Sequence, residues 1–345
     1  MDEALAELRF NGQRFGYWQR VDIRESVDDL CASINLDYVA QGVGDTLGLT
    51  PNTVVDVLIG GVLVSTARSD IRRRRVEADH HQMRFAGRSL GRELVDCQYS
   101  KTLSGLKLGE IVKRLCEAFK VPVKIAVETA TVPDFSMQCE IPANALINAV
   151  RAANLLLYPQ PDGGLILTKP TDALPVSTLQ YGVNIQAYEV VDEDKLRFSD
   201  YTIKGYDYGA NSALKGAARD AGITFFRPMH VVADKHGQGL GSCERRAVLE
   251  RNRRLARAHR IEIEVPGWRY QDGAGQWQPW AINTQVRVII PGEDIDDVFL
   301  IGERAFRIDD RGGHMTMLQV MHRNAFLGEE KKKTKRGAGV KGAKK

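Results

Sequence analysis

The 345-residue chain lacks a cysteine pair at metal-binding or redox spacing and lacks a long apolar run. Its five cysteines are widely spaced, which argues against a disulfide scaffold or a zinc site; they are Cys31, Cys97, Cys116, Cys139 and Cys243. The most apolar stretch, residues 54–64, is interrupted by Asp56 and Gly60-Gly61. It is far shorter than the roughly 20 residues that span a bilayer. The acidic start also lacks a signal-peptide pattern, so we expect neither a membrane anchor nor export.

An excess of one charge is also missing from residues 1–328, which contain 40 basic and 42 acidic side chains. The net charge of +4 arises in residues 329–345, where eight basic residues accompany two acidic ones. A body that coats nucleic acid would need a clear basic excess. The lysine-rich end is Lys/Gly/Ala low-complexity sequence with no apolar anchor that could offset the entropy of ordering, so we expect residues 328–345 to form a disordered basic tail.

Short alternating strands are what the sequence does contain at its start. Residues 54–59 and 62–65 flank Gly60-Gly61, which tolerates the positive φ angles of a tight hairpin turn. A second hairpin is predicted between residues 69–78 and 81–86. We predict a first β-barrel domain over residues 1–97.

Helical periodicity begins after residue 97. Leu108, Ile111, Val112, Leu115 and Phe119 share one face of a predicted helix. A second helix is expected from Pro142, with Leu157 on its inner face, until Pro159 stops it. With strands at 121–127 and 165–168, these elements predict a small α/β domain over residues 98–175.

Residues 176–327 return to strands, interrupted by one helix near residues 242–259. Strands are predicted at 201–205, 260–265, 284–290, 298–301, 305–308 and 316–322. We expect a second β-barrel domain with this helical insertion. The expected fold class is therefore α+β, mainly β, with two similar antiparallel β-barrel domains and a small α/β domain between them.

An internal repeat relates the first and third regions. Asn52-Thr53-Val54 resembles Asn283-Thr284-Gln285, and the segment from His81 resembles the segment from His314. The strand, hairpin and strand between these points follow the same order. A duplicated β unit favours a subunit that presents the same kind of edge twice.

Candidate catalytic and metal-binding motifs are weak. Gly87-Arg88-Ser89-Leu90-Gly91 matches the G-x-S-x-G nucleophile elbow, but that motif needs an α/β-hydrolase sheet, which this β-rich region does not predict. His80-His81 would point to opposite faces of a strand and could not chelate one ion together. The glycines of residues 42–48 have the wrong spacing for a dinucleotide loop. We expect no catalytic, cofactor-binding or metal-binding residues, and no enzyme activity.

Two basic features stand out in the body, Arg72-Arg73-Arg74-Arg75 and the arginine-rich helix near residues 242–259. A strand divides four arginines between its two faces, and acidic residues partly balance the helix. A solvated face is the simpler interpretation, and contact with phosphate or an acidic partner is the alternative. The lysine tail could touch nucleic acid without sequence preference.

Several segments together resemble the baseplate hub proteins of Mu-like contractile-tailed bacteriophages, which are related to the phage late control protein D family. They are Phe85-Ala86-Gly87-Arg88-Ser89, Leu94-Val95-Asp96-Cys97, Tyr201-Thr202-Ile203-Lys204-Gly205-Tyr206, Phe226-Arg227-Pro228-Met229, and the arginine-rich helix running into residues 261–268. The resemblance runs in the same order from about Arg9 to Phe326.

The resemblance implies a structural virion protein that forms a homotrimeric ring, assembled in the host cytoplasm. Such a ring joins the tail spike protein to the tail tube or other baseplate proteins, and DNA passes through its channel without sequence-specific binding. Each family subunit contributes two similar barrels, so three subunits can match a six-fold tube. A nucleic-acid-binding module and a G-x-S-x-G hydrolase acting on the cell envelope remain the alternatives.

The tail gives a first test. Truncation after Gly328 should leave the thermal midpoint and the oligomer size unchanged, because residues 329–345 have no apolar periodicity and a strong like-charge run. Thermal unfolding and light scattering of the full-length and truncated proteins measure both. A large drop in either quantity would show that the tail packs on the body or on a neighbour.

Overall fold

A computed structural model describes residues 6–39, 48–77, 81–207, 211–233, 243–309 and 313–327. The predicted tail, His80 and nearly all of the glycine-containing loop at 42–48 lie outside these residues. Strands account for 53% of the described residues and helices for 17%, which confirms a mainly β protein. Within the described residues no helix is long and apolar enough to cross a membrane.

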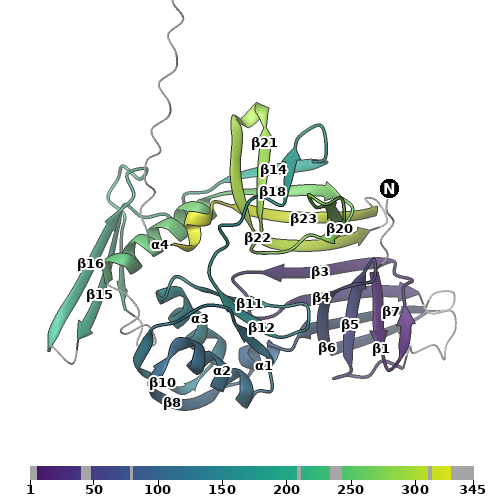
Figure 1. Cartoon of the computed structure of the whole chain (residues 1–345), viewed down its shortest axis with the longest axis horizontal. Coiled ribbons are helices and arrows are strands. Elements are labelled where there is room, and N and C mark those ends of the chain that lie inside the picture. The colour runs from purple at the N-terminus through teal and green to yellow at the C-terminus, as the bar shows by residue number, and fades with distance from the viewer. Residues whose placement is uncertain are drawn as a thin grey trace, which may run out of the picture.

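One sheet of 13 strands runs through the first and last parts of the chain (Figure 1). Its main path has the order β14-β18-β23-β22-β3-β4-β7-β6-β5-β1-β2, with β21 pairing β22 and β13 pairing β21. The first region contributes β1 Ala6–Phe10, β2 Gln13–Phe15, β3 Arg20–Ser26, β4 Ser33–Val39, β5 Val54–Ile59, β6 Val62–Val76 and β7 His81–Ser89. The last region contributes β13 Ser177–Gln180, β14 Ala187–Asp192, β18 His259–Pro266, β21 Gln285–Ile290, β22 Ile295–Asp309 and β23 Gly313–Met321.

The predicted repeat is present as two meanders with the same strand order. β5, β6 and β7 contain 6, 15 and 9 residues, and β21, β22 and β23 contain 6, 15 and 9 residues. A bulge interrupts β6 between Ser69 and Ile71 and β22 between Ile301 and Glu303. We call β1 and β3 to β7 the first copy. The second copy consists of β13, β14, β18, β21, β22 and β23.

The residue before each meander has the same backbone geometry. Asn52 and Asn283 both have positive φ, at 69° and 55°, a conformation that asparagine tolerates better than most residues. The amide of Asn52 donates to the carbonyl of Ser69, and the amide of Asn283 donates to the carbonyl of Ile301, both at 2.9 Å. Equivalent turns therefore begin equivalent hairpins, which explains why the Asn-Thr sequence recurs.

The prediction of two closed barrels is not confirmed. Among the described residues the strand order is an open path, and the two copies join through an antiparallel ladder between β3 and β22. A single apolar core contains buried residues from both copies, including Ile23, Leu36, Ile263 and Leu318. Merging the two regions into one sheet lets them share this core, instead of closing two small barrels separately.

The α/β part, whose helices and strands Figure 1 shows at the lower left, has its own apolar core. Its elements are α1 Arg92–Asp96, β8 Tyr99–Lys107, α2 Leu108–Ala118, β9 Val123–Ile125, β10 Thr131–Glu140, α3 Pro142–Ala152, β11 Leu156–Pro159 and β12 Leu165–Thr168. The predicted inner face of α2 is confirmed, since Leu108, Ile111, Val112 and Leu115 are all buried. The antiparallel pair of β8 and β10, which are separated in the chain by α2 and β9, was not predicted from the sequence.

Two predicted boundaries were wrong. The helix from Pro142 ends at Ala152, because Asn154 adopts a positive φ of 56° and turns the chain into β11, so Leu157 lies in a strand. The strands predicted at 298–301 and 305–308 are one strand, β22, because Gly302 is accommodated as a bulge.

The insertion between β14 and β18 forms a separate small layer. It contains β15 Asp200–Asp207, β16 Ser212–Arg219, β17 Pro228–Val232 and α4 Cys243–Ala258, close to the predicted helix. α4 lies between this three-stranded sheet and the 3₁₀ helix Arg323–Phe326 (Figure 1). A short hairpin, β19 Arg269–Gln271 with β20 Trp277–Pro279, follows β18, and a 3₁₀ turn at Pro291–Glu293 precedes β22.

Candidate functional site

The joint between the two copies contains a buried ion pair. Arg304 of β22 lies directly across from Glu25 of β3 in the ladder, and their side chains approach to 2.6 Å. These side chains are only 4% and 6% exposed. Arg304 also donates a hydrogen bond to the carbonyl of Trp280 and stacks over the ring of Phe306. A buried guanidinium needs such partners, because an unpaired charge would be costly there.

The sheet face opposite the core is polar across the joint. Asp22 and Arg24 of β3 lie on this face, and Arg24 forms an ion pair with Glu303 of β22 at 3.4 Å. Arg84 and Asp37 pair across β7 and β4 at 3.7 Å. The same face continues through Asn35, Glu262, Glu264, Arg307 and Gln319. Both charge signs alternate along it, so this face is hydrated without a strong net attraction for either sign.

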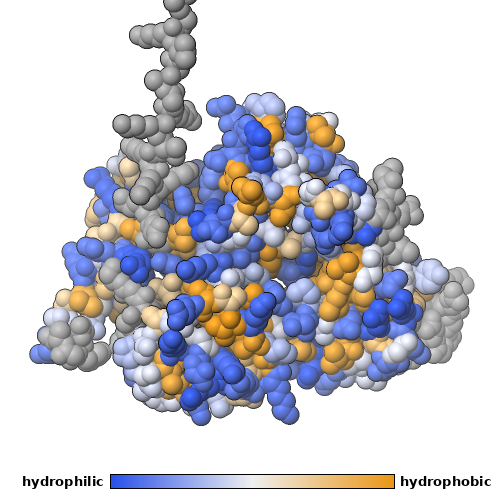
Figure 2. Space-filling view, in the orientation of Figure 1, coloured by the Kyte–Doolittle hydropathy of each residue, from blue (hydrophilic) through white to orange (hydrophobic). Residues whose placement is uncertain are grey.

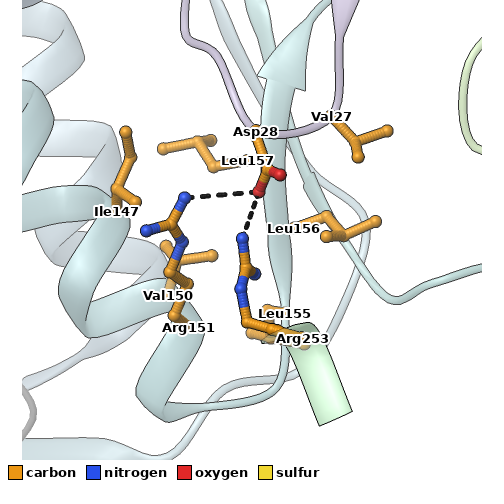
Figure 3. A pocket seen from close by; sticks show the side chains of 9 residues that line it. All are labelled: Val27, Asp28, Ile147, Val150, Arg151, Leu155, Leu156, Leu157 and Arg253. Carbon is orange, nitrogen blue, oxygen red and sulfur yellow. Dashed lines mark hydrogen bonds and ion pairs between the residues drawn. The ribbon is translucent and has the colours of Figure 1, made fainter. Parts of the chain in front are cut away.

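A second node connects three regions of the chain at Asp28 (Figure 3). Asp28 follows β3, and it receives Arg151 from α3 at 3.2 Å. From α4 it receives Arg257 at 3.0 Å and also Arg253, whose side chain is 9% exposed. The first copy, the α/β part and the insertion helix therefore meet at a single carboxylate.

Electrostatics at this node favour the ionised form of Asp28. Burial alone would raise the pKa of the carboxyl group, but the charges of Arg253, Arg257 and Arg151 outweigh it. The result is a pKa well below the usual range for aspartate. Asp28 therefore stays charged at any pH at which the protein is expected to work, and it fixes the relative placement of the three parts.

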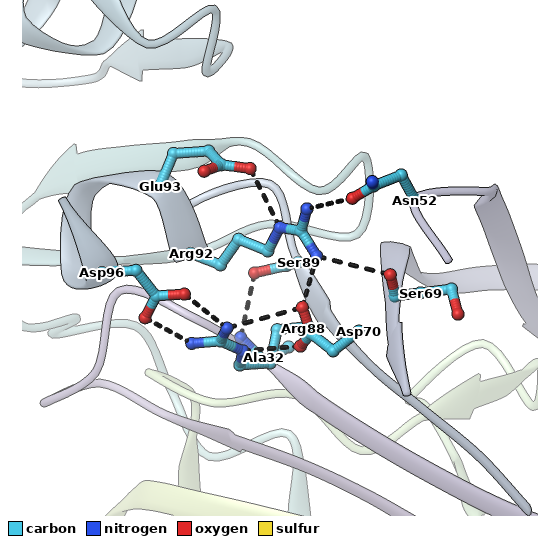
Figure 4. Close-up of polar contacts among 9 residues, drawn as sticks. All are labelled: Ala32, Asn52, Ser69, Asp70, Arg88, Ser89, Arg92, Glu93 and Asp96. Carbon is cyan, nitrogen blue, oxygen red and sulfur yellow. Dashed lines mark hydrogen bonds and ion pairs between the residues drawn. The ribbon is translucent and has the colours of Figure 1, made fainter. Parts of the chain in front are cut away.

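Ser89, the serine of the G-x-S-x-G match, forms hydrogen bonds that connect two strands (Figure 4). Its side chain is fully buried, and its hydroxyl accepts a hydrogen bond from the amide of Ala32 at 3.0 Å. Its own amide donates to the carbonyl of Ala32, also at 3.0 Å. Ser89 thus ties the end of β7 to the start of β4, and its oxygen faces no open cleft.

The neighbours of Ser89 form an ion-pair network (Figure 4). Arg88 bridges Asp70 at 2.7 Å and Asp96 at 2.6 Å, and Arg92 contacts Asp70 and donates to the side chain of Asn52 at 2.8 Å. The hydrogen bonds from Arg88 hold the pKa of Asp96 below its usual range. These contacts anchor α1 on the first copy and supply no general base for Ser89.

The histidines lie elsewhere. His259 and His322 line an open cleft of about 530 Å³ between the insertion and the second copy, and Ser89 is not among its lining residues. Asp220 of this cleft is held by Arg197 at 2.9 Å. In the described part of the chain, no group of three or more histidine, cysteine, aspartate or glutamate side chains could hold a metal ion.

The arginines of α4 mostly make internal contacts. Besides Arg253 and Arg257 at Asp28, Arg254 donates to the carbonyl of Leu196 and stacks over Phe198. Arg251 donates to the side chain of Asn252. These arginines therefore connect the insertion to the rest of the protein, and few of the α4 guanidinium groups remain available to bind nucleic acid.

Apolar surface does not single out a docking patch on the face of Figure 2, where hydrophilic residues surround several separate apolar groups. The most exposed large apolar side chains, Leu174, Tyr17 and Phe226, belong to different segments. The sheet edges and the polar face are therefore the strongest candidates for contact with partners.

Comparison with known proteins identifies the class. Residues 6–89 match the family model of the Mu phage baseplate assembly protein GpP-like N-terminal domain. Residues 92–169 match the second domain of baseplate hub proteins like gp44, and residues 241–329 match the fourth domain of the Mu phage baseplate assembly protein GpP. The class is that of phage-tail baseplate proteins.

Along nearly its whole length, the chain is similar to the baseplate hub proteins of Mu-like phages. It is 28% identical to the baseplate hub protein gp44 of Escherichia phage Mu over 340 residues, covering 93% of this chain and 88% of the phage protein. Its fold is shared with a 43 kDa tail protein of prophage MuSo2 from Shewanella oneidensis, at a TM-score of 0.80 and 22% identity, covering 94% of this chain and 99% of that one. A tail protein from Neisseria meningitidis MC58 gives a TM-score of 0.81 at 21% identity, covering 94% and 98%.

The node at Asp28 gives a stability prediction. Asp28→Asn should lower the free energy of unfolding at pH 7 by about 3 kcal/mol, because it leaves buried Arg253 without its carboxylate. Since the folded pKa of Asp28 is depressed, its contribution is present above about pH 4 and is lost as the pH falls further. The difference between wild type and variant should therefore shrink in acid.

Urea unfolding at pH 7 and at about pH 3 measures this difference. Asp134→Asn is a matched control, because Asp134 is an exposed carboxylate on β10 that accepts only a hydrogen bond from Ser104 among the contacts described. A variant at Asp28 as stable as wild type at pH 7 would contradict the role of the node.

Proposed function

We propose that the protein is the structural hub of a contractile phage-tail baseplate, a homotrimeric ring that adapts a three-fold spike to a six-fold tail tube. The observation that carries the proposal is the duplicated strand unit, which provides two equivalent segments per subunit. Three subunits with two equivalent segments each supply six contacts of one kind, which matches a six-fold partner without leaving half of its contacts empty.

The polar face of the sheet supports a channel for DNA. A phosphate backbone moving through a strongly basic channel would be held by it, since each neutralised phosphate adds affinity. Here acidic residues such as Asp22 and Glu303 alternate with Arg24 and Arg307. A wall of this kind lets DNA pass without sequence-specific binding.

In this proposal residues 1–97 and 176–327 supply the two ring domains. Residues 98–175 lie off the ring and contact the spike or the surrounding baseplate, and the tail at 328–345 has no assigned role. The protein works by shape and assembly as a component of the virion, has no catalytic residue and needs no cofactor. It assembles with its partners in the host cytoplasm before the tail is complete.

Mass in solution tests the ring. Sedimentation at micromolar concentration should give a species of three times the monomer mass, alone or with the spike protein added. Monomer under every condition, including with the spike present, would contradict the proposal. Light scattering of the same samples controls for elongated shapes that sediment slowly.

A further inference from the structure

We propose that β14 of one subunit pairs antiparallel with β6 of the next subunit, in the same register that β3 and β22 use within one chain. This inference rests on the proposed trimer and names the two strands that close it. The partner it commits to is a second copy of this chain.

Among the open strand edges of the described residues, two belong to corresponding places of the two copies. β14 is the last strand of the main path and pairs only with β18. In β6, residues 71–76 pair only with β7, because β5 covers just the first half of the strand, up to Arg68. The equivalent half of β22, residues 303–308, has β23 on one side and β3 on the other. Thus β6 lacks the neighbour that its repeat counterpart has.

The ladders show that β14 is the counterpart of β3. Within the first copy β3 pairs with β4, which pairs with β7; within the second copy β14 pairs with β18, which pairs with β23. Ile23 lies opposite Ile34, and Val190 lies opposite Ile261, at matching positions of the two ladders. The open edge of the second copy is therefore the same edge that the first copy inserts into the internal joint.

Copying the internal register predicts the intermolecular one. The internal pair of Arg304 with Glu25 corresponds to a predicted pair of Arg72 with Asp192 of the next subunit. The internal pair of Phe306 with Ile23 corresponds in the same way to Arg74 with Val190. At the strand end, Ile308 opposite Val21 becomes Val76 opposite Tyr188. Val76 is 59% exposed in the single subunit, as expected for an apolar side chain that is buried only when the next subunit binds.

Arg72 already makes one of the two contacts that its counterpart makes. Its guanidinium donates to the carbonyl of Leu49, as that of Arg304 donates to the carbonyl of Trp280. Arg304 then meets Glu25, whereas no carboxylate of the described residues lies within ion-pair distance of Arg72. Asp192, which is 70% exposed and touches only His259 among described ion pairs, would occupy the place of Glu25.

Charge complementarity supports this partner. The open half of β6 contains the arginine run 72–75, and β14 with its next residue contains Glu189, Asp192 and Glu193. Arg75 would face Glu189, as Arg307 faces Asp22 in the internal joint. Arg75 now pairs with the exposed Glu77, a contact that would be exchanged at little cost. The arginine run is thus explained as one side of an interface.

The two edges differ, so the contact is head-to-tail. A heterologous contact of this kind closes into a ring when the rotation between subunits allows it. Closing the ring also covers these two open edges, which otherwise invite uncontrolled pairing.

Paired cysteines test the register. Arg74→Cys combined with Val190→Cys should give disulfide-linked dimers and trimers on mild oxidation, because directly opposed residues of antiparallel strands lie at about 4.5–5.5 Å between Cα atoms, within disulfide range. The parent for all variants carries Cys139→Ser, since Cys139 is the exposed native thiol. Denaturing gels with and without reductant give the readout.

Three controls make every outcome decisive. Each single cysteine variant should remain uncrosslinked, and Arg74→Cys with Val191→Cys should crosslink weakly, because Val191 points to the other face of the strand. Equal crosslinking of both pairs would overturn the register. Trimers in sedimentation without crosslinks for the Val190 pair would overturn this interface and leave the hub proposal standing, whereas monomers throughout would overturn both.

Discussion

Backbone pairing between β3 and β22 is the constraint on which the rest of the structure depends. It joins segments about 280 positions apart in sequence and merges two copies of one strand unit into a single sheet. The buried pair of Arg304 with Glu25 sets the register of that joint, since a one-residue shift of either strand would turn its charge to the other face and leave the opposite charge buried without its partner. A buried ion pair adds little net stability, but it penalises wrong registers strongly.

The same joint explains why the chain has two unlike edges. Because β3 of the first copy pairs with β22 of the second, their counterparts β14 and the far half of β6 each keep a neighbour on one side only in the described residues. The α/β part and the insertion attach outside the repeated ladder, through the ion pairs at Asp28 and the Arg88 to Asp70 network and through side chains such as Tyr158 and Ala256 in the main core.

The sequence predicted the local elements well and the long-range arrangement poorly. Alternation and helical periodicity placed α2, α4 and the β5 to β7 meander, and the Asn-Thr pairs revealed the duplication. The two predicted β-barrels are not confirmed, and strand alternation could not establish them, because it reports which face is buried and not which distant strand lies alongside. The strand β22 was predicted as two strands, because the bulge at Gly302 interrupts the alternation and leaves no periodic signal of its own. Asp28 belongs to no motif, so only its three arginine partners from α3 and α4 reveal its role.

Amide hydrogen exchange across assembly tests the central claim, that unlike edges of one repeated sheet complete each other. Peptides covering residues 71–76 and 187–192 should gain protection together when subunits assemble, whereas residues 20–26 of β3, already paired on both sides, should be protected throughout. Protection of only one of the two edges in the assembled protein, or of neither, would contradict the account.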